Sequence, residues 1–442
     1  MAQTKPIPMI SKKSQQLEGI IDVPSDKSMS HRAFMLSALA VGESYISNAL
    51  TAEDVTATRH AMSCFGARIT KIDPLTWAVQ GVGMLEEPKI ALDFGNAGTG
   101  SRLTMGMMAS TPISATFVGD ASLHKRPMQR ILDPLHRLGA SSLSRHGHRL
   151  PLTLRGTDQG LALQHKPSVA SAQVKSAILL AALNIKGRTE IIETAPTRDH
   201  TEKMLLGAGV DVQTDRKNPQ HPVVSIVGPQ APKPQKWVIP ADPSSAAFPL
   251  VAALCVPGSE VTIKQVMLNP HRTGLFTCLE EMGADLTYAN HQVVGGEEVA
   301  DITARYSKLQ AIDISESRAP SMIDEYPILA MAAAQAEGVT IMRGLHELRV
   351  KESDRLQIVH DHLKDAGVAC KIVGDDLHVT GGKIQGGIKI DTHLDHRIAM
   401  SFFVLGLFAE NDILIDDMRT AETSFPGFAQ IMSQLGASCE AC

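Results

Sequence analysis

The chain has 442 residues, of which 43% are hydrophobic and 20% charged, and this length predicts two domains of about 200 residues each. The net charge of −5 argues against bulk attraction to nucleic acid or an anionic membrane, and 4% aromatic residues leave few surfaces for stacking bases. No apolar run approaches the roughly 18 residues of a membrane span, and residues 1–15 lack a signal-peptide core, so we expect a cytoplasmic protein.

The first predicted helix follows a short extended segment that ends at Pro24. Ser25 and Asp26 are typical N-cap residues, and apolar side chains recur along one face from Ala33 to Ala40. The head of this helix carries Lys27, Ser28, Ser30, His31 and Arg32. Free N–H groups and the positive end of the helix dipole favour an anion there, so the segment predicts a phosphate or carboxylate site.

A second copy of this pattern begins about 216 residues later, where Val238–Ser245 leads into an alanine-rich helix that ends near Gly258. The copy lacks the lysine and the arginine, so we interpret it as a structural version of the same unit in a duplicated chain. Helix-end glycines followed by a strand pattern recur at about 70 to 85 residues and predict six units, three in each half: Gly66, Gly139, Gly207, Gly283, Gly367 and Gly436.

Each unit also contains an almost wholly apolar helix, which we expect to be buried. These helices are predicted at 33–40, 103–109, 177–183, 246–254, 328–336 and 398–408. The Pro-rich run 218–235 predicts the boundary between the halves, and residues before Ile20 could pair with the second half. We therefore predict one domain at 21–238 and a second at 1–20 plus 239–442, with a two-stranded hinge near 20–22 and 237–241.

Polar groups also precede the other apolar helices. The glycine-rich turn at Gly95–Gly100 precedes a helix expected to begin near Arg102, whereas the pair Lys125 and Arg126, taken alone, is typical of a solvated surface. The third unit has Ser171–Ser176 and Thr197–Thr201, the fifth has Asp324 and the cluster Lys351, Glu352 and Arg355, and the sixth has His396 and Arg397. Charges at the spacing of that cluster most often pair with each other on a solvated face.

Five of the six helix heads thus carry groups that can bind phosphate, while the fourth is bland. In a chain of net negative charge, this repetition predicts one convergent anion site between the two halves. Asp324 and Glu352 lie among the cations and are the acid and base candidates. The six cysteines show no disulfide or metal-binding spacing, so we expect no metal.

Seven motifs occur in order from about Glu18 to the C-terminus: KSMSHR, GNAGTGSRLTMG, KRPM, SAQVKSA, RAPSMIDEYPILA, LRVKESDR and HLDHRIAMSF. Together they resemble the 5-enolpyruvylshikimate-3-phosphate synthases, in particular the second class, which is known for glyphosate-tolerant members. The resemblance implies an α/β fold, a two-domain inside-out α/β barrel of six βαβαββ units with three per domain. It also implies transfer of enolpyruvyl from phosphoenolpyruvate to the 5-hydroxyl of shikimate 3-phosphate, releasing phosphate through a tetrahedral intermediate, in chorismate and aromatic amino-acid biosynthesis.

By their positions in these motifs, the resemblance also implies which residues form the site. It further implies that the reaction uses no metal or organic cofactor, and we expect a monomer. Catalysis is implied for Asp324 as base, Glu352 as acid and Lys27. Shikimate 3-phosphate is expected to contact Lys27, Ser28, Arg32, Ser171, Ala172, Gln173, Arg198, Asp324 and Lys351. Phosphoenolpyruvate is expected to contact Lys27, Asn96, Gly98, Thr99, Arg126, Gln173, Glu352, Arg355, His396 and Arg397.

Three positions depart from the family patterns. The C-terminal loop at 422–426 has no lysine where many members have one, and Ala172 replaces a serine of the better-known class. Gly98 stands where tolerant second-class members carry alanine.

Three alternative functions remain open. The related transferase that acts on UDP-N-acetylglucosamine usually relies on a loop cysteine, and 121–130 has none. An RNA terminal phosphate cyclase would be expected to show more basic and aromatic surface. A repeat scaffold without activity would have no reason to carry anion-binding groups at five helix heads.

Overall fold

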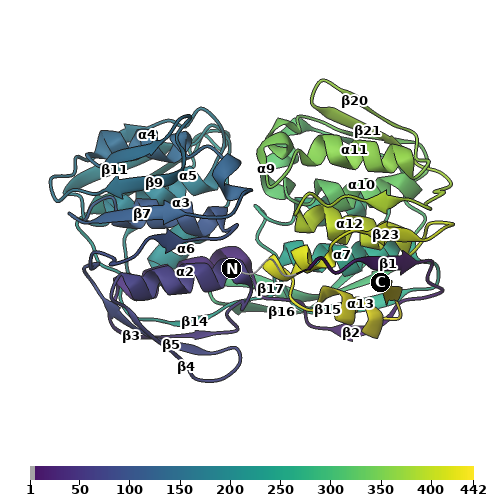
Figure 1. Cartoon of the computed structure of the whole chain (residues 1–442), viewed down its shortest axis with the longest axis horizontal. Helices are drawn as coiled ribbons and strands as arrows, with labels where there is room; N and C mark the ends of the chain where they lie inside the picture. The colour runs from purple at the N-terminus through teal and green to yellow at the C-terminus, as the bar shows by residue number, and fades with distance from the viewer. Residues whose placement is uncertain (1–4) are drawn as a thin grey trace. The chain divides into compact units, whose positions relative to one another are not determined.

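The computed structural model describes residues 5–442, and the chain divides into two compact units (Figure 1). Unit 1 contains the described residues up to Pro24, together with Pro240–Val293 and Glu297–Cys442. Unit 2 contains Ser25–Ile239 and Val294–Gly296. The chain therefore passes between the units after Pro24 and after Ile239, and a short return at 294–296 interrupts unit 1.

The described strands of unit 2 form three four-stranded sheets. In neighbour order, the first contains β14 (Lys236–Val238), β3 (Val41–Ser47), β5 (Trp77–Val82) and β4 (Arg68–Lys71). The second contains β6 (Leu92–Asp93), β7 (Ser114–Val118), β9 (Arg149–Arg155) and β8 (Ser141–Arg145). The third contains β10 (Gln164–His165), β11 (Gly187–Ile192), β13 (Val223–Gly228) and β12 (Val212–Asp215).

Unit 1 likewise has three four-stranded sheets in its described part. The first contains β16 (Asp285–Val294), β17 (Glu297–Arg305), β15 (Glu260–Met267) and β2 (Glu18–Ile21). The second contains β18 (Asp313–Ile314), β19 (Val339–Met342), β21 (Asp376–Thr380) and β20 (Cys370–Val373). The third contains β22 (Lys389–Ile390), β23 (Ile413–Ile415), β1 (Met9–Lys12) and β24 (Ser438–Ala441).

One pairing pattern recurs in all six sheets of residues 5–442. Each has a parallel pair at one edge, such as β6 with β7, followed by a strand antiparallel to the second, such as β9. Strand β1 lies between β23 and β24, with Ile10 opposite both Leu414 and Glu440 (Figure 1). The first described strand therefore pairs with strands of the second half, a pairing that the sequence left possible for residues before Ile20.

The helices fall into a buried set and an outer set. Nearly every residue is buried in α1 (Lys27–Leu39), α3 (Gly98–Met108), α5 (Ala172–Ala182), α7 (Pro243–Cys255), α10 (Tyr326–Gln335) and α12 (His396–Gly406), as predicted. The outer set has exposed positions and contains α2 (Glu53–Cys64), α4 (Gln129–Leu138), α6 (His200–Gly207), α8 (Gly274–Glu281), α11 (Arg355–Asp365) and α13 (Phe428–Gln434). Short turns complete the list: η1 (Leu123–Lys125), η2 (Glu316–Arg318), α9 (Ala319–Met322), η3 (His346–Val350) and η4 (Met418–Thr423). Among the described residues, none of these helices is both long and apolar enough to cross a membrane.

Aspartate caps explain where several buried helices begin. The Asp26 carboxylate accepts the backbone N–H of Met29 at 2.7 Å, and the Asp242 carboxylate accepts that of Ser244 at 3.0 Å. These bonds satisfy N–H groups that have no partner inside the helix. Because α1 and α7 each start one residue after the aspartate and have equal length, the predicted duplication is visible in their bounds.

Helix α3 begins at Gly98, earlier than the start predicted near Arg102. Three glycines in 95–100 lower the intrinsic helix propensity, which is why the pattern favoured a turn there. Further along α3, Gly106 lies directly against the backbone of Ala177 in α5. A Cβ atom at Gly106 would come within 2.4 Å of the Ala177 carbonyl oxygen.

We therefore predict that Gly106→Ala lowers the stability of the protein by about 1–3 kcal/mol or more, because two buried helices must move apart. The change should appear as a lower midpoint in urea unfolding. Gly207→Ala is a matched control in α6, since a Cβ there meets nothing within 4 Å. This control should leave stability unchanged or raise it by up to about 1 kcal/mol. Equal midpoints for the two variants would contradict the packing argument.

Candidate active site

The head of α1 brings together two cations that the sequence singled out. Lys27 forms an ion pair with Asp54, with 3.1 Å between Nζ and Oδ2. Arg32 is buried, with only 4% of its surface exposed. Its Nε donates to the Thr201 hydroxyl at 2.6 Å, and its Nη1 donates to the Ser28 carbonyl at 2.9 Å. The guanidinium is therefore held in one orientation inside unit 2.

His31 contributes no positive charge to this site. Its side chain is fully buried, and Nδ1 contacts the Thr58 hydroxyl at 2.8 Å. Burial, reinforced by the neighbouring charges of Lys27 and Arg32, lowers the pKa of His31 to about 3. The imidazole is thus neutral at physiological pH, and only Lys27 and Arg32 of this motif supply charge.

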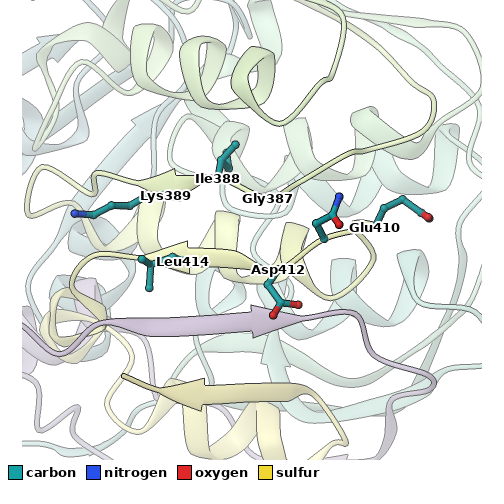
Figure 2. Close-up of a pocket in the computed structure, with 7 residues that line it drawn as sticks. Gly387, Ile388, Lys389, Glu410, Asp412 and Leu414 are labelled. Carbon is teal, nitrogen blue, oxygen red and sulfur yellow. The ribbon is translucent and has the colours of Figure 1, made fainter.

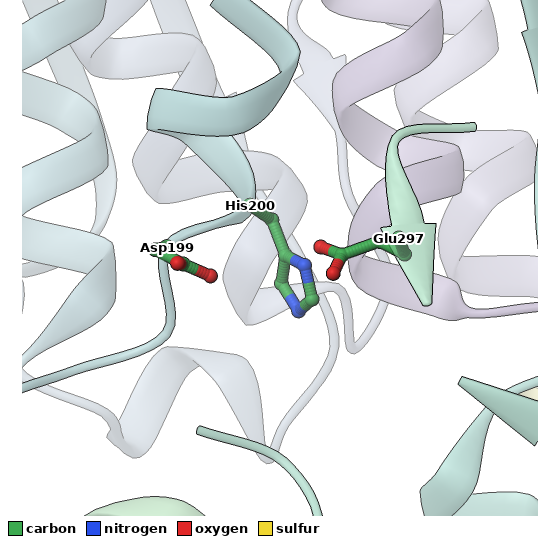
Figure 3. A group of neighbouring side chains, drawn as sticks. All are labelled: Asp199, His200 and Glu297. Atoms are coloured by element: carbon green, nitrogen blue, oxygen red, sulfur yellow. The ribbon is translucent and has the colours of Figure 1, made fainter. Parts of the chain in front are cut away.

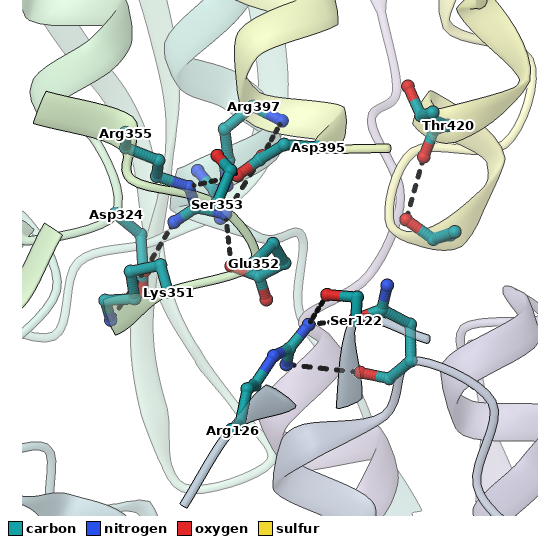
Figure 4. Close-up of polar contacts among 12 residues, drawn as sticks. Ser122, Arg126, Asp324, Lys351, Glu352, Ser353, Arg355, Asp395, Arg397 and Thr420 are labelled. Atoms are coloured by element: carbon teal, nitrogen blue, oxygen red, sulfur yellow. Dashed lines mark hydrogen bonds and ion pairs between the residues drawn. The ribbon is translucent and has the colours of Figure 1, made fainter. Parts of the chain in front are cut away.

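Arg126 is buried, whereas its neighbour Lys125 is exposed. The solvated-surface interpretation of this pair is therefore wrong for Arg126. Its guanidinium donates to the side-chain oxygen of Asn96 and, at 3.1 Å, to the Ser122 hydroxyl (Figure 4). Asn96 in turn donates to Asp120 at 3.0 Å. The turn before α3 and the segment before α4 are thereby joined through one arginine.

The head of α5 is tied to α3 by a glutamine. Gln173 accepts a hydrogen bond from Arg102 at 2.8 Å and donates one to the Thr99 hydroxyl at 3.0 Å. The Ser171 hydroxyl caps α5 by accepting the Val174 N–H at 3.4 Å, and Ala172 is the first helical residue. Arg198 is half-buried in the loop that precedes α6. Thr99, Gln173 and Ser171 thus lie on elements that touch within unit 2.

In unit 1, Arg355 lies at the centre of a cluster of carboxylates (Figure 4). The guanidinium contacts Asp395 at 2.8 Å, Glu352 at 2.6 Å and Asp324 at 3.2 Å. Lys351 contacts the same Asp324 oxygen at 3.1 Å. Burial alone would lower the pKa of Arg355, but the three carboxylates outweigh it and raise the pKa. Of the three charges predicted to pair with each other on a solvated face, Glu352 and Arg355 form a pair, whereas Lys351 contacts Asp324. Arg355 is buried rather than solvated.

Arg397, at the head of α12, reaches two other helix heads through a buried carboxylate. Its Nη1 lies 3.1 Å from Glu325, which accepts a hydrogen bond from the Ser244 hydroxyl. Arg272 contacts both Ser244 at 3.0 Å and Asp242 at 2.7 Å. The fourth helix head, interpreted as bland, therefore has a cation, which comes from the segment before α8. His396 is buried as the first residue of α12.

The predicted residues are divided between the units. Unit 2 holds those from Lys27 to Arg198, and unit 1 holds those from Asp324 to Arg397. Five neighbours with direct contacts were missed: Asp54, Arg102, Asp120, Glu325 and Asp395. Arg102, Glu325 and Asp395 lie inside recognised motifs, so their spacing could have indicated them. The roles of all these residues in binding and catalysis stay predictions.

Two further features do not join this site. A groove beside β22 and β23 is lined by Gly387, Ile388, Lys389, Glu410, Asn411, Asp412 and Leu414, none of which is a predicted site residue (Figure 2). Asp199 and His200 lie at the start of α6, and Glu297 starts β17 (Figure 3). Because the first two belong to unit 2 and Glu297 to unit 1, no one unit holds the trio as a metal site. Within unit 1, Glu297 accepts hydrogen bonds from Asn269 at 3.0 and 3.1 Å.

Comparison with known proteins shows the family to which this chain belongs. The family model for EPSP synthase (3-phosphoshikimate 1-carboxyvinyltransferase) matches residues 11–432. The 3-phosphoshikimate 1-carboxyvinyltransferase of a Chelativorans species is 52% identical over 98% of both chains. That of Zymomonas mobilis is 50% identical over 99% of both. The solved EPSP synthase of Acinetobacter baumannii has a TM-score of 0.87 and 40% identity, covering 99% of this chain and 100% of that one. With the mixed sheets, this likeness indicates an α/β enolpyruvyl transferase fold, and the chain belongs to the EPSP synthase family.

Proposed function

We propose that this protein transfers the enolpyruvyl group of phosphoenolpyruvate to the 5-hydroxyl of shikimate 3-phosphate and releases phosphate. The reaction belongs to the shikimate pathway of chorismate and aromatic amino-acid biosynthesis. Both substrates are small polyanions, so the protein must hold fixed cations. One observation carries the proposal beyond family membership. In the described part of the chain, the buried arginines are Arg32, Arg126, Arg272, Arg355 and Arg397, and all but Arg272 were predicted from the motifs.

Burial of an arginine is costly unless its charge is paired and hydrogen-bonded. A protein that needed only stability would keep these side chains on its surface. Their position at helix heads, where N–H groups also favour anions, fits the binding of phosphate and carboxylate groups. A guanidinium presents two parallel donors to such a group, which a lysine cannot do.

The proposed sites take residues from both units. Shikimate 3-phosphate would contact Lys27, Ser28, Arg32, Ser171, Ala172, Gln173 and Arg198 of unit 2, and Asp324 and Lys351 of unit 1. Phosphoenolpyruvate would contact Lys27, Asn96, Gly98, Thr99, Arg126 and Gln173 of unit 2, and Glu352, Arg355, His396 and Arg397 of unit 1. The chain passes between the units after Pro24 and after Ile239, close to the proposed hinge segments near 20–22 and 237–241. The recurring sheet pattern likewise supports six βαβαββ units in an inside-out barrel.

The chemistry needs one proton removed and another delivered. The 5-hydroxyl loses its proton as its oxygen bonds to C2 of phosphoenolpyruvate, and the methylene carbon gains a proton. Loss of phosphate from C2 and of a proton from the new methyl group then regenerates the enol ether. Asp324 is proposed as the base toward the hydroxyl, and its contacts with Lys351 at 3.1 Å and Arg355 at 3.2 Å hold the carboxylate in place.

Glu352 is proposed as the acid toward the methylene carbon, with Lys27 sharing proton transfer. In the structure Glu352 is paired with Arg355 at 2.6 Å. An anionic ligand bound to Arg355 would compete for the guanidinium and leave Glu352 able to take up and deliver a proton. The same residue can therefore shield the arginine in the free protein and act in the reaction.

The proposed reaction is tested by measuring phosphate release from phosphoenolpyruvate with shikimate 3-phosphate, with UDP-N-acetylglucosamine and without an acceptor. We expect turnover only with shikimate 3-phosphate. Turnover with UDP-N-acetylglucosamine alone would favour the related transferase, which the comparisons do not support. Release without any acceptor would indicate a phosphatase.

We predict that Glu352→Gln lowers kcat about 10²-fold or more, because glutamine keeps the reach of the side chain but cannot deliver a proton. The dissociation constant of shikimate 3-phosphate should stay close to that of the unmodified protein. Glu337→Gln, at an exposed position of unit 1, is the matched control and should change neither quantity. Near-normal turnover of Glu352→Gln would exclude Glu352 as the acid.

Unlike Glu352→Gln, Arg32→Ala should mainly weaken the binding of shikimate 3-phosphate. It removes a buried, charge-assisted phosphate contact, so shikimate 3-phosphate should bind at least about 10-fold more weakly. The exposed Arg68→Ala serves as its control. Unchanged affinity in Arg32→Ala, measured by calorimetry, would remove Arg32 from the proposed phosphate site.

Gly98→Ala tests the departure from the tolerant members of the second class. A Cβ atom there would lie 2.9 Å from Arg126 Nη1 and 3.3 Å from Arg102 Nη1. Both guanidinium groups would therefore have to shift to make room for the new methyl group. Glyphosate is longer than phosphoenolpyruvate and would need more of this space. We predict that Gly98→Ala weakens inhibition by glyphosate about 10–200-fold and raises the KM for phosphoenolpyruvate much less. An unchanged inhibition constant, at matched saturation with phosphoenolpyruvate, would show that Gly98 does not control access.

A further inference from the structure

A second buried ionic cluster lies in unit 2, and none of its charged members belongs to the proposed substrate contacts. Lys175 of α5 is 1% exposed, although lysine is almost never fully buried without a partner. Its Nζ contacts Glu202 of α6 at 2.6 Å and Glu193, which follows β11, at 3.0 Å. Both glutamates are themselves buried.

The charges of this cluster do not balance, since one cation faces two carboxylates. Burial alone would lower the pKa of Lys175, but the two glutamates outweigh it and raise the pKa. Burial raises the pKa of Glu202 against the opposing influence of Lys175. Among the described residues, Glu202 Oε2 is buried without a hydrogen-bond partner. Apolar side chains of similar size often stabilise a fold as well as such a cluster does, so stability alone does not explain it.

The cluster connects directly to groups that orient Arg32. Ser176 follows Lys175 in α5, and Thr201 precedes Glu202 in α6. The hydroxyls of Ser176 and Thr201 contact each other at 2.7 Å, and both accept hydrogen bonds from Arg32, at 2.9 and 2.6 Å. The ion pair between Lys175 and Glu202 therefore fixes the spacing of the two hydroxyls that hold the guanidinium.

The same lysine also reaches the loop that carries Arg198. Lys175 Nζ donates to the Thr197 carbonyl at 3.4 Å. The Thr197 hydroxyl donates to Glu193, the second carboxylate of the cluster. Thr197 immediately precedes Arg198, so the backbone at the base of that arginine is held by Lys175 and Glu193 together.

We propose that Lys175, Glu193 and Glu202 are positioning residues that set Arg32 and Arg198 at the spacing needed for a phosphate monoester. This inference rests on the proposed function, which assigns both arginines to shikimate 3-phosphate. The three residues act through other side chains and touch no substrate. Their expected signature is therefore a loss of affinity for one substrate, with the chemical step preserved.

Lys175→Met keeps the length of the side chain and removes its charge. We expect the dissociation constant and the KM of shikimate 3-phosphate to rise about 10-fold or more, because small misplacements of binding groups are costly. The KM of phosphoenolpyruvate and kcat should stay within about threefold. Lys186→Met, at an exposed position after α5, is the matched control and should change none of them.

Lys175→Met leaves two buried carboxylates unpaired and could fail to fold. The triple variant Lys175→Met, Glu193→Gln and Glu202→Gln removes this charge and should recover the melting temperature. If positioning is the role, shikimate 3-phosphate still binds about 10-fold more weakly in the triple variant. A triple variant with normal affinity for shikimate 3-phosphate would overturn the proposal, because the cluster would then be merely structural.

The same variants separate this inference from the proposed function. If the unmodified protein shows no turnover with shikimate 3-phosphate, the proposed function fails. Binding of inorganic phosphate, measured by calorimetry, then decides the positioning role. Weaker phosphate binding in the triple variant than in the Lys186→Met control would support the positioning role, and equal binding would refute it.

Discussion

The burial of arginine side chains is the constraint on which the arrangement of this protein depends. A guanidinium cannot lose its charge in a protein, so each buried arginine must be given acceptors that match its planar set of donors. Arg355 obtains them from Asp395, Glu352 and Asp324, and Arg32 obtains them from hydroxyl and carbonyl oxygens. These acceptors lie in or just before several different helices, so each arginine ties segments together that are far apart in the sequence.

The repeated unit makes such contacts possible. Apolar helices such as α3 and α5 are buried along their length and pack closely. At one point Gly106 of α3 lies directly against the backbone of Ala177 in α5. The heads of these helices carry capping residues, free N–H groups and charged side chains. The fourth helix head has no cation of its own but still takes part in ionic contacts. The Ser244 hydroxyl accepts a hydrogen bond from Arg272 and donates one to Glu325.

Sequence reasoning succeeded where the signal was local. The aspartate caps, the matching lengths of α1 and α7 and the buried helices all follow from periodicity and from residues that cap helices. It failed where a contact joins distant segments. In the sequence Arg126 resembles a surface residue, and only the structure shows its contacts with Asn96 and Ser122. The contact between Arg102 and Gln173 likewise depends on the packing of α3 against α5. Spacing along the chain carries no information about such pairs, so they required the folded structure.

Preorganisation by carboxylates has a cost that bears on how the site works. In the structure, Lys351 contacts Asp324, and Arg355 contacts Asp324, Glu352 and Asp395. If this cluster binds an anion as proposed, the anion must compete with carboxylates that already occupy the donors, and its affinity falls. In return the donors are fixed before binding, so less rotamer freedom is lost when the anion arrives. A site built this way favours ligands with several anionic groups, because only they can replace several carboxylates at once. Two phosphorylated substrates meet that requirement, whereas a single small anion does not.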